Sequence, residues 1–94
     1  MKPIFRIIYH SAVVKRDIPR LDAGIGSRVR HAIEAKLSVA PEELSKPLAY
    51  SRKGLWRLRV GDWRVVFAIR GTEVWVLRIG HRREVYDSIP EPLE

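Results

Sequence analysis

The hydrophobic and polar positions of the first 40 residues predict a strand followed by two helices. Residues 3–9 are rich in β-branched and aromatic side chains, a composition typical of strands. Ser11 is placed to cap a short helix that reaches about residue 18, where Pro19 ends or kinks it. A second helix is predicted for residues 25–38. Its apolar residues recur at helical spacing and form one stripe, which consists of Ile25, Val29, Ala32, Ile33 and Leu37.

The second half of the chain alternates with the period of two that is typical of strands. Three runs of this kind occur, at residues 55–60, 63–70 and 73–80. The two connections have two residues each and begin with Gly61 and Gly71, which predicts tight hairpins and an antiparallel meander. Residues 39–54 contain several Pro, Ser and Gly and are predicted to be a connecting loop, with one helical turn near residues 41–44.

Alternation within the predicted strands separates an apolar face from a face that carries arginines. The apolar face consists of Trp56, Leu58, Val60, Trp63, Val65, Phe67, Ile69, Trp75, Leu77 and Ile79. The opposite face carries Arg57, Arg59, Arg64 and Arg78. We predict an α+β fold of one domain, residues 1–94, in which the N-terminal strand and the meander form an antiparallel sheet. The apolar face of this sheet packs against the two helices.

Size and composition agree with one small globular domain. The chain has 94 residues and 10.9 kDa, and 46% of the residues are hydrophobic, enough for a continuous core. The absence of cysteine excludes disulfides, thiolate zinc sites and cysteine nucleophiles. No window holds the roughly 18 apolar residues of a membrane span, so we expect a soluble protein that does not enter a membrane.

Positive charge is concentrated in the second half. The formal net charge is +7, and residues 46–83 hold ten of the 18 Lys and Arg but only two of the 11 Asp and Glu. A strongly basic small domain most often binds a polyanion or an acidic protein. The planar fork of arginine suits phosphate oxygens, so we interpret the arginine-bearing face as a phosphate-binding groove. The alternative interpretation is the ordinary solvated face of an antiparallel sheet.

Residues 46–83 lack the paired carboxylates that two-metal nucleases use. The two acidic residues of this segment, Asp62 and Glu73, belong to different hairpins, which disfavours a shared divalent ion. RNA offers a metal-free route, in which its own 2′-hydroxyl attacks the adjacent phosphorus. This route needs a base, positive charge for the phosphorane oxygens and an acid for the leaving oxygen. The candidates are Arg57, Arg64, His81, Arg82 and Tyr86. An ordinary surface position for the histidine, and a core position for the tyrosine, are the alternatives.

The meander and the segment after it contain two motifs. Residues 54–69 read G-L-W-R-L-R-V-G-D-W-R-V-V-F-A-I, and residues 76–86 read V-L-R-I-G-H-R-R-E-V-Y. With these motifs, residues 14–21 and the second helix, the chain resembles the RelE toxins of the RelE/ParE superfamily of type II toxin–antitoxin systems. The resemblance implies a cytoplasmic mRNA interferase with a RelE-like fold, which enters the A site of the 70S ribosome and cuts the mRNA there. It implies an endoribonuclease that needs no metal and no cofactor.

The resemblance also implies roles for individual residues. Tyr86 is the base toward the 2′-hydroxyl, and Arg82 is the acid for the leaving 5′-oxygen. Arg57 and Arg64 hold the scissile phosphate, and the expected products are a 2′,3′-cyclic phosphate and a 5′-hydroxyl. Related toxins sometimes use a histidine near the C-terminus as the acid, so His81 stays open as an alternative to Arg82.

One position departs from the family pattern. Leu55 stands where some relatives have a lysine, so one charge is absent unless Lys53 or Arg59 replaces it. We predict that further basic residues contact RNA phosphates, namely Lys53, Arg59, Arg78 and Arg83.

A RelE-like toxin implies a cognate, RelB-like antitoxin whose disordered segment folds on the toxin and neutralises it. Such segments are often acidic and helical, which suits the basic half of this chain. We expect the antitoxin either to cover the sheet or to displace the C-terminal segment. Two other functions stay open: a ParE-like toxin that inhibits DNA gyrase without cutting nucleic acid, and a module that binds RNA and leaves it intact.

Overall fold

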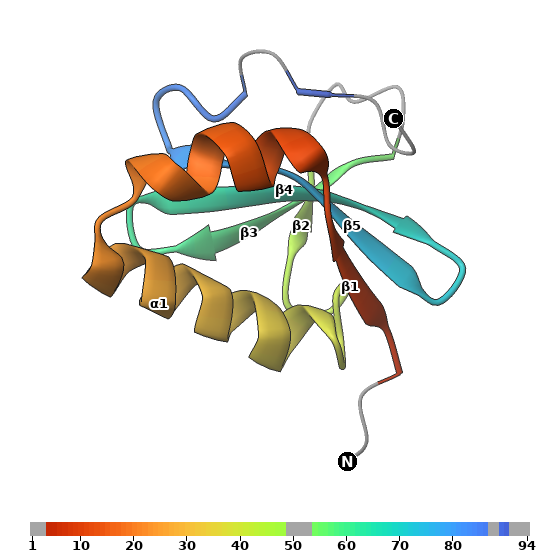
Figure 1. Cartoon of the computed structure of the whole chain (residues 1–94). Helices are drawn as coiled ribbons and strands as arrows, with labels where there is room; N and C mark the ends of the chain where they lie inside the picture. Colours follow the sequence, from red (N-terminus) through yellow and green to blue (C-terminus); the bar gives the residue numbers. More distant parts are fainter. Residues whose placement is uncertain (1–3, 49–53, 87–88, 91–94) are drawn as a thin grey trace.

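The chain forms a five-stranded sheet with two helical segments on one face (Figure 1). The computed structural model describes residues 4–48, 54–86 and 89–90. The elements are β1 (Arg6–Tyr9), α1 (Ala23–Ala32), β2 (Lys46–Pro47), β3 (Trp56–Val60), β4 (Trp63–Arg70) and β5 (Glu73–His81). Their order in the sheet is β1-β5-β4-β3-β2. No helix within the described ranges is long and apolar enough to cross a membrane.

The α+β fold class is confirmed, and two details of the sheet differ from the prediction. β1 pairs with β5 in parallel, so the sheet is mixed and not wholly antiparallel. The predicted loop contains β2, which pairs with β3 through Lys46–Arg57 and Pro47–Trp56. Pro47 is tolerated there because β2 is an edge strand, where a missing N–H breaks no ladder. The two predicted hairpins are confirmed, with Gly61 and Gly71 both at positive φ.

The first helical segment (residues 11–20) is irregular. It contains a π-helical turn at Val13–Asp17 and a 3-10 turn at Ile18–Arg20, which includes Pro19. The predicted cap at Ser11 is wrong, because the helical conformation already includes this residue. His10 performs the role instead, since its Nδ1 accepts a hydrogen bond from the Ala12 N–H at 3.0 Å.

The second helix follows the prediction closely. Asp22 caps α1 by accepting a hydrogen bond from the Ile25 N–H at 2.9 Å, so the helix begins two residues before the predicted start. A π-helical turn, Ile33–Leu37, extends it. Val29, Ile33 and Leu37 of the predicted stripe are fully or almost fully buried.

Apolar side chains form two clusters, one on each face of the sheet. The main cluster lies between the sheet and the helical segments and contains Val13, Val29, Ile33, Leu37, Leu58, Val60, Val65, Phe67, Val74, Val76 and Ile79. The second lies on the other face and contains Leu55, Val66, Ala68, Leu77 and Val85. The face of the sheet that was predicted to carry arginines therefore also carries an apolar cluster, and Val85 of the segment that follows β5 packs in this cluster.

A β-bulge in β5 changes which side chains face the helices. Val66 pairs with Arg78, but the next residue, Phe67, pairs with Val76, so Leu77 is the extra residue. The prediction that Trp75 and Leu77 share the helix-facing side is wrong, because both pack in the second cluster. The extra residue shifts the alternation by one position within the strand.

Candidate functional site

The chain turns sharply after β5 and returns across the second cluster. The N–H groups of Glu84 and Val85 donate hydrogen bonds to the His81 carbonyl at 3.0 and 2.9 Å. Val85 is fully buried, and a Cβ added at Gly80 would lie 3.4 Å from its Cα and Cβ. The missing side chain at Gly80 thus allows the returning segment to lie close to β5, which positions Tyr86.

Two predicted catalytic residues meet as a result. The Tyr86 hydroxyl accepts a hydrogen bond from Arg57 Nη1 at 3.3 Å, although the residues are 29 positions apart. Tyr86 is 38% exposed and Arg57, on β3, is partly exposed, so a ligand can reach both. A cationic donor of this kind stabilises the tyrosine oxygen when it carries negative charge.

Arg64, the second residue of β4, lies on the same face of the sheet as Arg57. It lies opposite Arg59 of β3 and opposite Gly80 of β5. Its Nη1 donates hydrogen bonds to the carbonyls of Gly61 at 2.8 Å and Trp63 at 3.0 Å, which hold the guanidinium at the hairpin. Like charges directly opposite in an antiparallel pair are unfavourable, and a bound anion would relieve this repulsion.

Arg82 lies at the same end of the sheet. Its N–H donates a hydrogen bond to the Asp62 carbonyl at 2.9 Å, and its Nε is 4.0 Å from Asp62 Oδ1. Both side chains are at least half exposed, so the ion pair is weak and leaves the guanidinium accessible to a substrate.

The structure does not bring His81 to the arginines. His81 pairs with Trp63 in the register, and their rings meet edge to face with centroids 5.7 Å apart. Trp63 packs against the main cluster, so this ring contact lies on the helix-facing side of the sheet, opposite to Arg64. Arg83 is exposed, and Lys53 lies outside the described residues.

Arg78 is not on the exposed basic face, so that part of the prediction is wrong. It is only 8% exposed, and its Nε lies 3.7 Å from Oδ1 of the buried Asp17. Asp17 Oδ2 also accepts a hydrogen bond from the Ile79 N–H at 2.8 Å. Arg78 therefore takes part in a buried link between β5 and the first helical segment, although it pairs with Val66 in the register as the alternation predicts.

A concave region of about 230 Å³ lies beside β3, and we call it the basic hollow. Its lining consists of Lys36, Leu44, Ser45, Lys46, Arg57, Leu58, Arg59 and Arg64. None of these residues is acidic, and the five cations come from the π-helical turn, β2, β3 and β4. Sequence reasoning missed Lys36 and Lys46, because Lys36 lies off the apolar stripe of the predicted second helix and Lys46 lies in the predicted loop.

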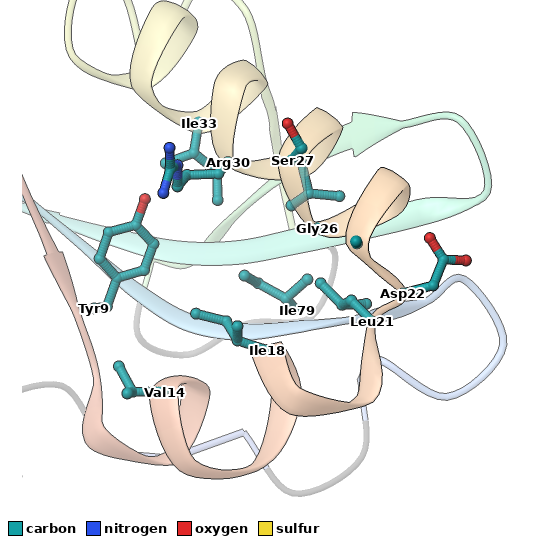
Figure 2. Close-up of a pocket in the computed structure, with 12 residues that line it drawn as sticks. Tyr9, Val14, Ile18, Leu21, Asp22, Gly26, Ser27, Arg30, Ile33 and Ile79 are labelled. Carbon is teal, nitrogen blue, oxygen red and sulfur yellow. The ribbon is translucent and has the colours of Figure 1, made fainter.

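A larger hollow of about 450 Å³, the apolar groove, lies between the first helical segment and α1 (Figure 2). It is lined by Tyr9, Val14, Ile18, Leu21, Asp22, Ala23, Gly26, Ser27, Val29, Arg30, Ile33 and Ile79. Val14 and Ile18, one helical turn apart, are 52% and 41% exposed. The buried Tyr9 hydroxyl has no hydrogen-bond partner among the described residues. Burial raises the pKa of Tyr9, and the nearby Glu34 carboxylate raises it further.

Comparisons with known proteins agree with this architecture. Residues 5–86 match the family described as the ParE toxin of the type II toxin–antitoxin system, parDE. Toxin RelE of Mycobacterium tuberculosis (strain ATCC 25618 / H37Rv) is 33% identical over 87% of this chain and 90% of its own length.

Two solved structures share the fold. The toxin–antitoxin complex RelBE2 of Mycobacterium tuberculosis contains a chain that is 28% identical, with a TM-score of 0.75 over 86% of this chain and all of its own length. The RelB–RelE complex of Methanococcus jannaschii matches with a TM-score of 0.65 and 22% identity, over 88% of this chain and 99% of its own length. This chain therefore belongs to the RelE/ParE family of toxins of type II toxin–antitoxin systems.

Proposed function

We propose that this toxin is a ribosome-dependent mRNA interferase, which cuts mRNA in the ribosomal A site and so stops translation in the cytoplasm. The observation that carries the proposal is the hydrogen bond between Arg57 and the Tyr86 hydroxyl, with Arg64 on the same face of the sheet. A tyrosine oxygen that contacts one guanidinium group, with a second guanidinium group on the same face of the sheet, offers a base and positive charge to one phosphodiester.

The reaction uses these groups in turn. Tyr86 Oη takes the proton of the substrate's 2′-hydroxyl. The substrate's 2′-oxygen then attacks the adjacent phosphorus. Arg57 and Arg64 stabilise the charge of the phosphorane oxygens. The bond from phosphorus to the 5′-oxygen breaks as Arg82 supplies a proton, which leaves a 2′,3′-cyclic phosphate and a 5′-hydroxyl. We assign the acid to Arg82 and not to His81, because the histidine ring packs on the opposite side of the sheet.

We also propose that the cognate, RelB-like antitoxin places an amphipathic helix in the apolar groove. Two solved relatives are complexes of a toxin with its antitoxin, which supports a partner of this kind. The exposed Val14 and Ile18 offer contacts to an apolar helical stripe, and the Tyr9 hydroxyl offers a hydrogen bond. The excess of basic residues favours acidic residues on the rest of the helix.

A ParE-like toxin that inhibits DNA gyrase is the second candidate. It is favoured by the description of the matching family, which names the ParE toxin. An inhibitor that cuts nothing has no need of a tyrosine held on an arginine in an accessible position, and this contact supports the nuclease instead.

Primer extension on an mRNA under translation tests the proposal. The purified toxin is added with ribosomes in one reaction and to ribosome-free mRNA in another, and gyrase supercoiling is measured in parallel. We expect cuts inside codons only where ribosomes are present, with gyrase unaffected. Intact mRNA in both reactions, together with inhibited supercoiling, would refute the interferase.

A further inference from the structure

We propose that the basic hollow is a second phosphate site, which holds the phosphodiester next to the one that is cut. The inference rests on the proposed function, because the occupant is the backbone of the cleaved RNA strand. It newly assigns Lys36, Ser45 and Lys46 to substrate binding, and it places Arg59, which the sequence already predicts to contact RNA, at this second phosphate. The proposed reaction uses none of these four residues.

The register connects the hollow to the reacting groups. Lys46 of β2 lies directly opposite Arg57, and Arg59 lies directly opposite Arg64. Directly opposite residues in an antiparallel pair share a face, with Cβ atoms roughly 4.5–5.5 Å apart. Each residue that holds the scissile phosphate thus has a second cation beside it, at the edge of the sheet where the hollow opens.

Charge indicates an anionic occupant. The hollow brings together five cations and no carboxylate. One of them, Lys36, belongs to the π-helical turn that follows α1. Cations gathered in this way repel one another unless an anion compensates them. Within the described residues, neither Lys36 nor Lys46 forms an ion pair with a carboxylate of the chain.

Ser45 supplies an independent observation. Its hydroxyl oxygen is buried, it lines the hollow, and it has no hydrogen-bond partner among the described residues. A buried hydroxyl without a partner destabilises a protein, and native structures usually satisfy such groups. A phosphate oxygen in the hollow would accept its hydrogen bond. Lysine and arginine side chains around a hydroxyl donor are typical contacts to nucleic-acid phosphates.

The test measures binding without cleavage. Labelled RNA dinucleotides and trinucleotides with a 2′-O-methyl group at the cleaved position have one and two internal phosphates. Their affinities are measured by fluorescence anisotropy over a range of salt concentrations. The variant Lys36→Ala/Lys46→Ala is compared with Lys15→Ala/Arg20→Ala, which also removes two exposed cations but leaves the hollow intact.

We expect the trinucleotide to bind more tightly than the dinucleotide to wild type and to the control variant. The Lys36→Ala/Lys46→Ala variant should bind both RNAs with similar affinity. Its salt slope should become less steep by about 0.7 for each phosphate that the protein no longer neutralises. Ser45→Ala, which removes a single oxygen, should weaken trinucleotide binding and leave dinucleotide binding unchanged.

Equal trinucleotide affinities for the two double variants would overturn the second phosphate site. Loss of binding to the small ribosomal subunit alone, with trinucleotide binding intact, would overturn it as well and would assign the hollow to ribosomal RNA. Loss of binding only to an acidic antitoxin peptide would refute an RNA occupant. Binding that depends on Lys36 and Lys46 in a toxin that cuts no mRNA would support the site and refute the proposed reaction.

Discussion

The basic hollow is lined by five cations beside β3, whereas the apolar groove between the two helical segments is lined mainly by aliphatic side chains. The hollow draws its residues from the edge of the sheet and from the end of a helix. The groove shares Val29, Ile33 and Ile79 with the main core cluster. Charge at an edge suits a polyanion, and an extension of the core suits an apolar partner. The two surfaces are therefore separable by mutation, even in a chain of 94 residues.

Among the variants proposed here, Tyr86→Phe is expected to have the largest effect, which is on RNA cleavage. The ring keeps its packing and loses the oxygen that Arg57 contacts, so cleavage should fall by about 10²- to 10⁴-fold, as for loss of a general base. Single-turnover cleavage on programmed ribosomes measures this fall, and antitoxin affinity should stay near that of wild type. Cleavage at the full rate would require another base.

Arg64→Ala should lower cleavage by about 10²- to 10³-fold, because it removes a charge that stabilises the phosphorane. The same assay applies, with Arg20→Ala as the matched control. Arg20 is exposed in the first helical segment and lines neither hollow. If both variants cleaved at similar rates, Arg64 would not belong to the reacting site.

Ile18→Glu tests the apolar groove, which Ile18 lines. Burial of an aliphatic side chain is worth about 1.5–3 kcal/mol, so antitoxin affinity should fall roughly 10- to 100-fold. Lys15→Glu is the control, because it adds the same side chain to the same helical segment outside the groove. Titration calorimetry measures the affinity, and ribosomal cleavage should be unchanged. If the antitoxin bound both variants equally well, it would not bind in the apolar groove.

The smallest expected effect is that of Tyr9 on the pH dependence of the free energy of unfolding. Its raised pKa means that the folded state holds the phenol proton more tightly than the unfolded state. This contribution to stability is complete below the unfolded value of about 10 and is lost as the pH rises through the higher folded value. In urea denaturation above pH 10, Tyr9→Phe should lose unfolding free energy less steeply than wild type. Tyr86→Phe controls for the loss of one phenol, and identical slopes for all three proteins would contradict the effect.

Local periodicity was enough to predict most of the elements and part of the site. The strands of the meander, both hairpins and the buried stripe of α1 follow from the spacing of apolar residues and from Gly61 and Gly71. These features depend on a few neighbouring residues, because side-chain direction repeats with a fixed backbone period. The alternation also placed Arg57 and Arg64 correctly on one face of the sheet.

Other features depend on contacts between residues far apart in the chain. The bulge at Leu77 turns Trp75 away from the helices, and Asp17 binds Arg78 across 61 positions. β2 exists only because Lys46 and Pro47 find an edge of β3 to pair with. No local pattern records these pairings, since each is selected by the packing of the whole chain.

The sequence by itself determined the types of the main elements, the basic character of the second half and the residue types available for chemistry. Only the tertiary structure decided which of these side chains meet. Tyr86, for example, reaches Arg57 because Val85 lies close to Gly80. The tertiary structure also decided that Lys36 and Lys46 join the arginines in one hollow and that Arg78 is buried away from it. The composition of a chain fixes how many charged side chains it has. Strand register and packing decide which of them lie together at one site.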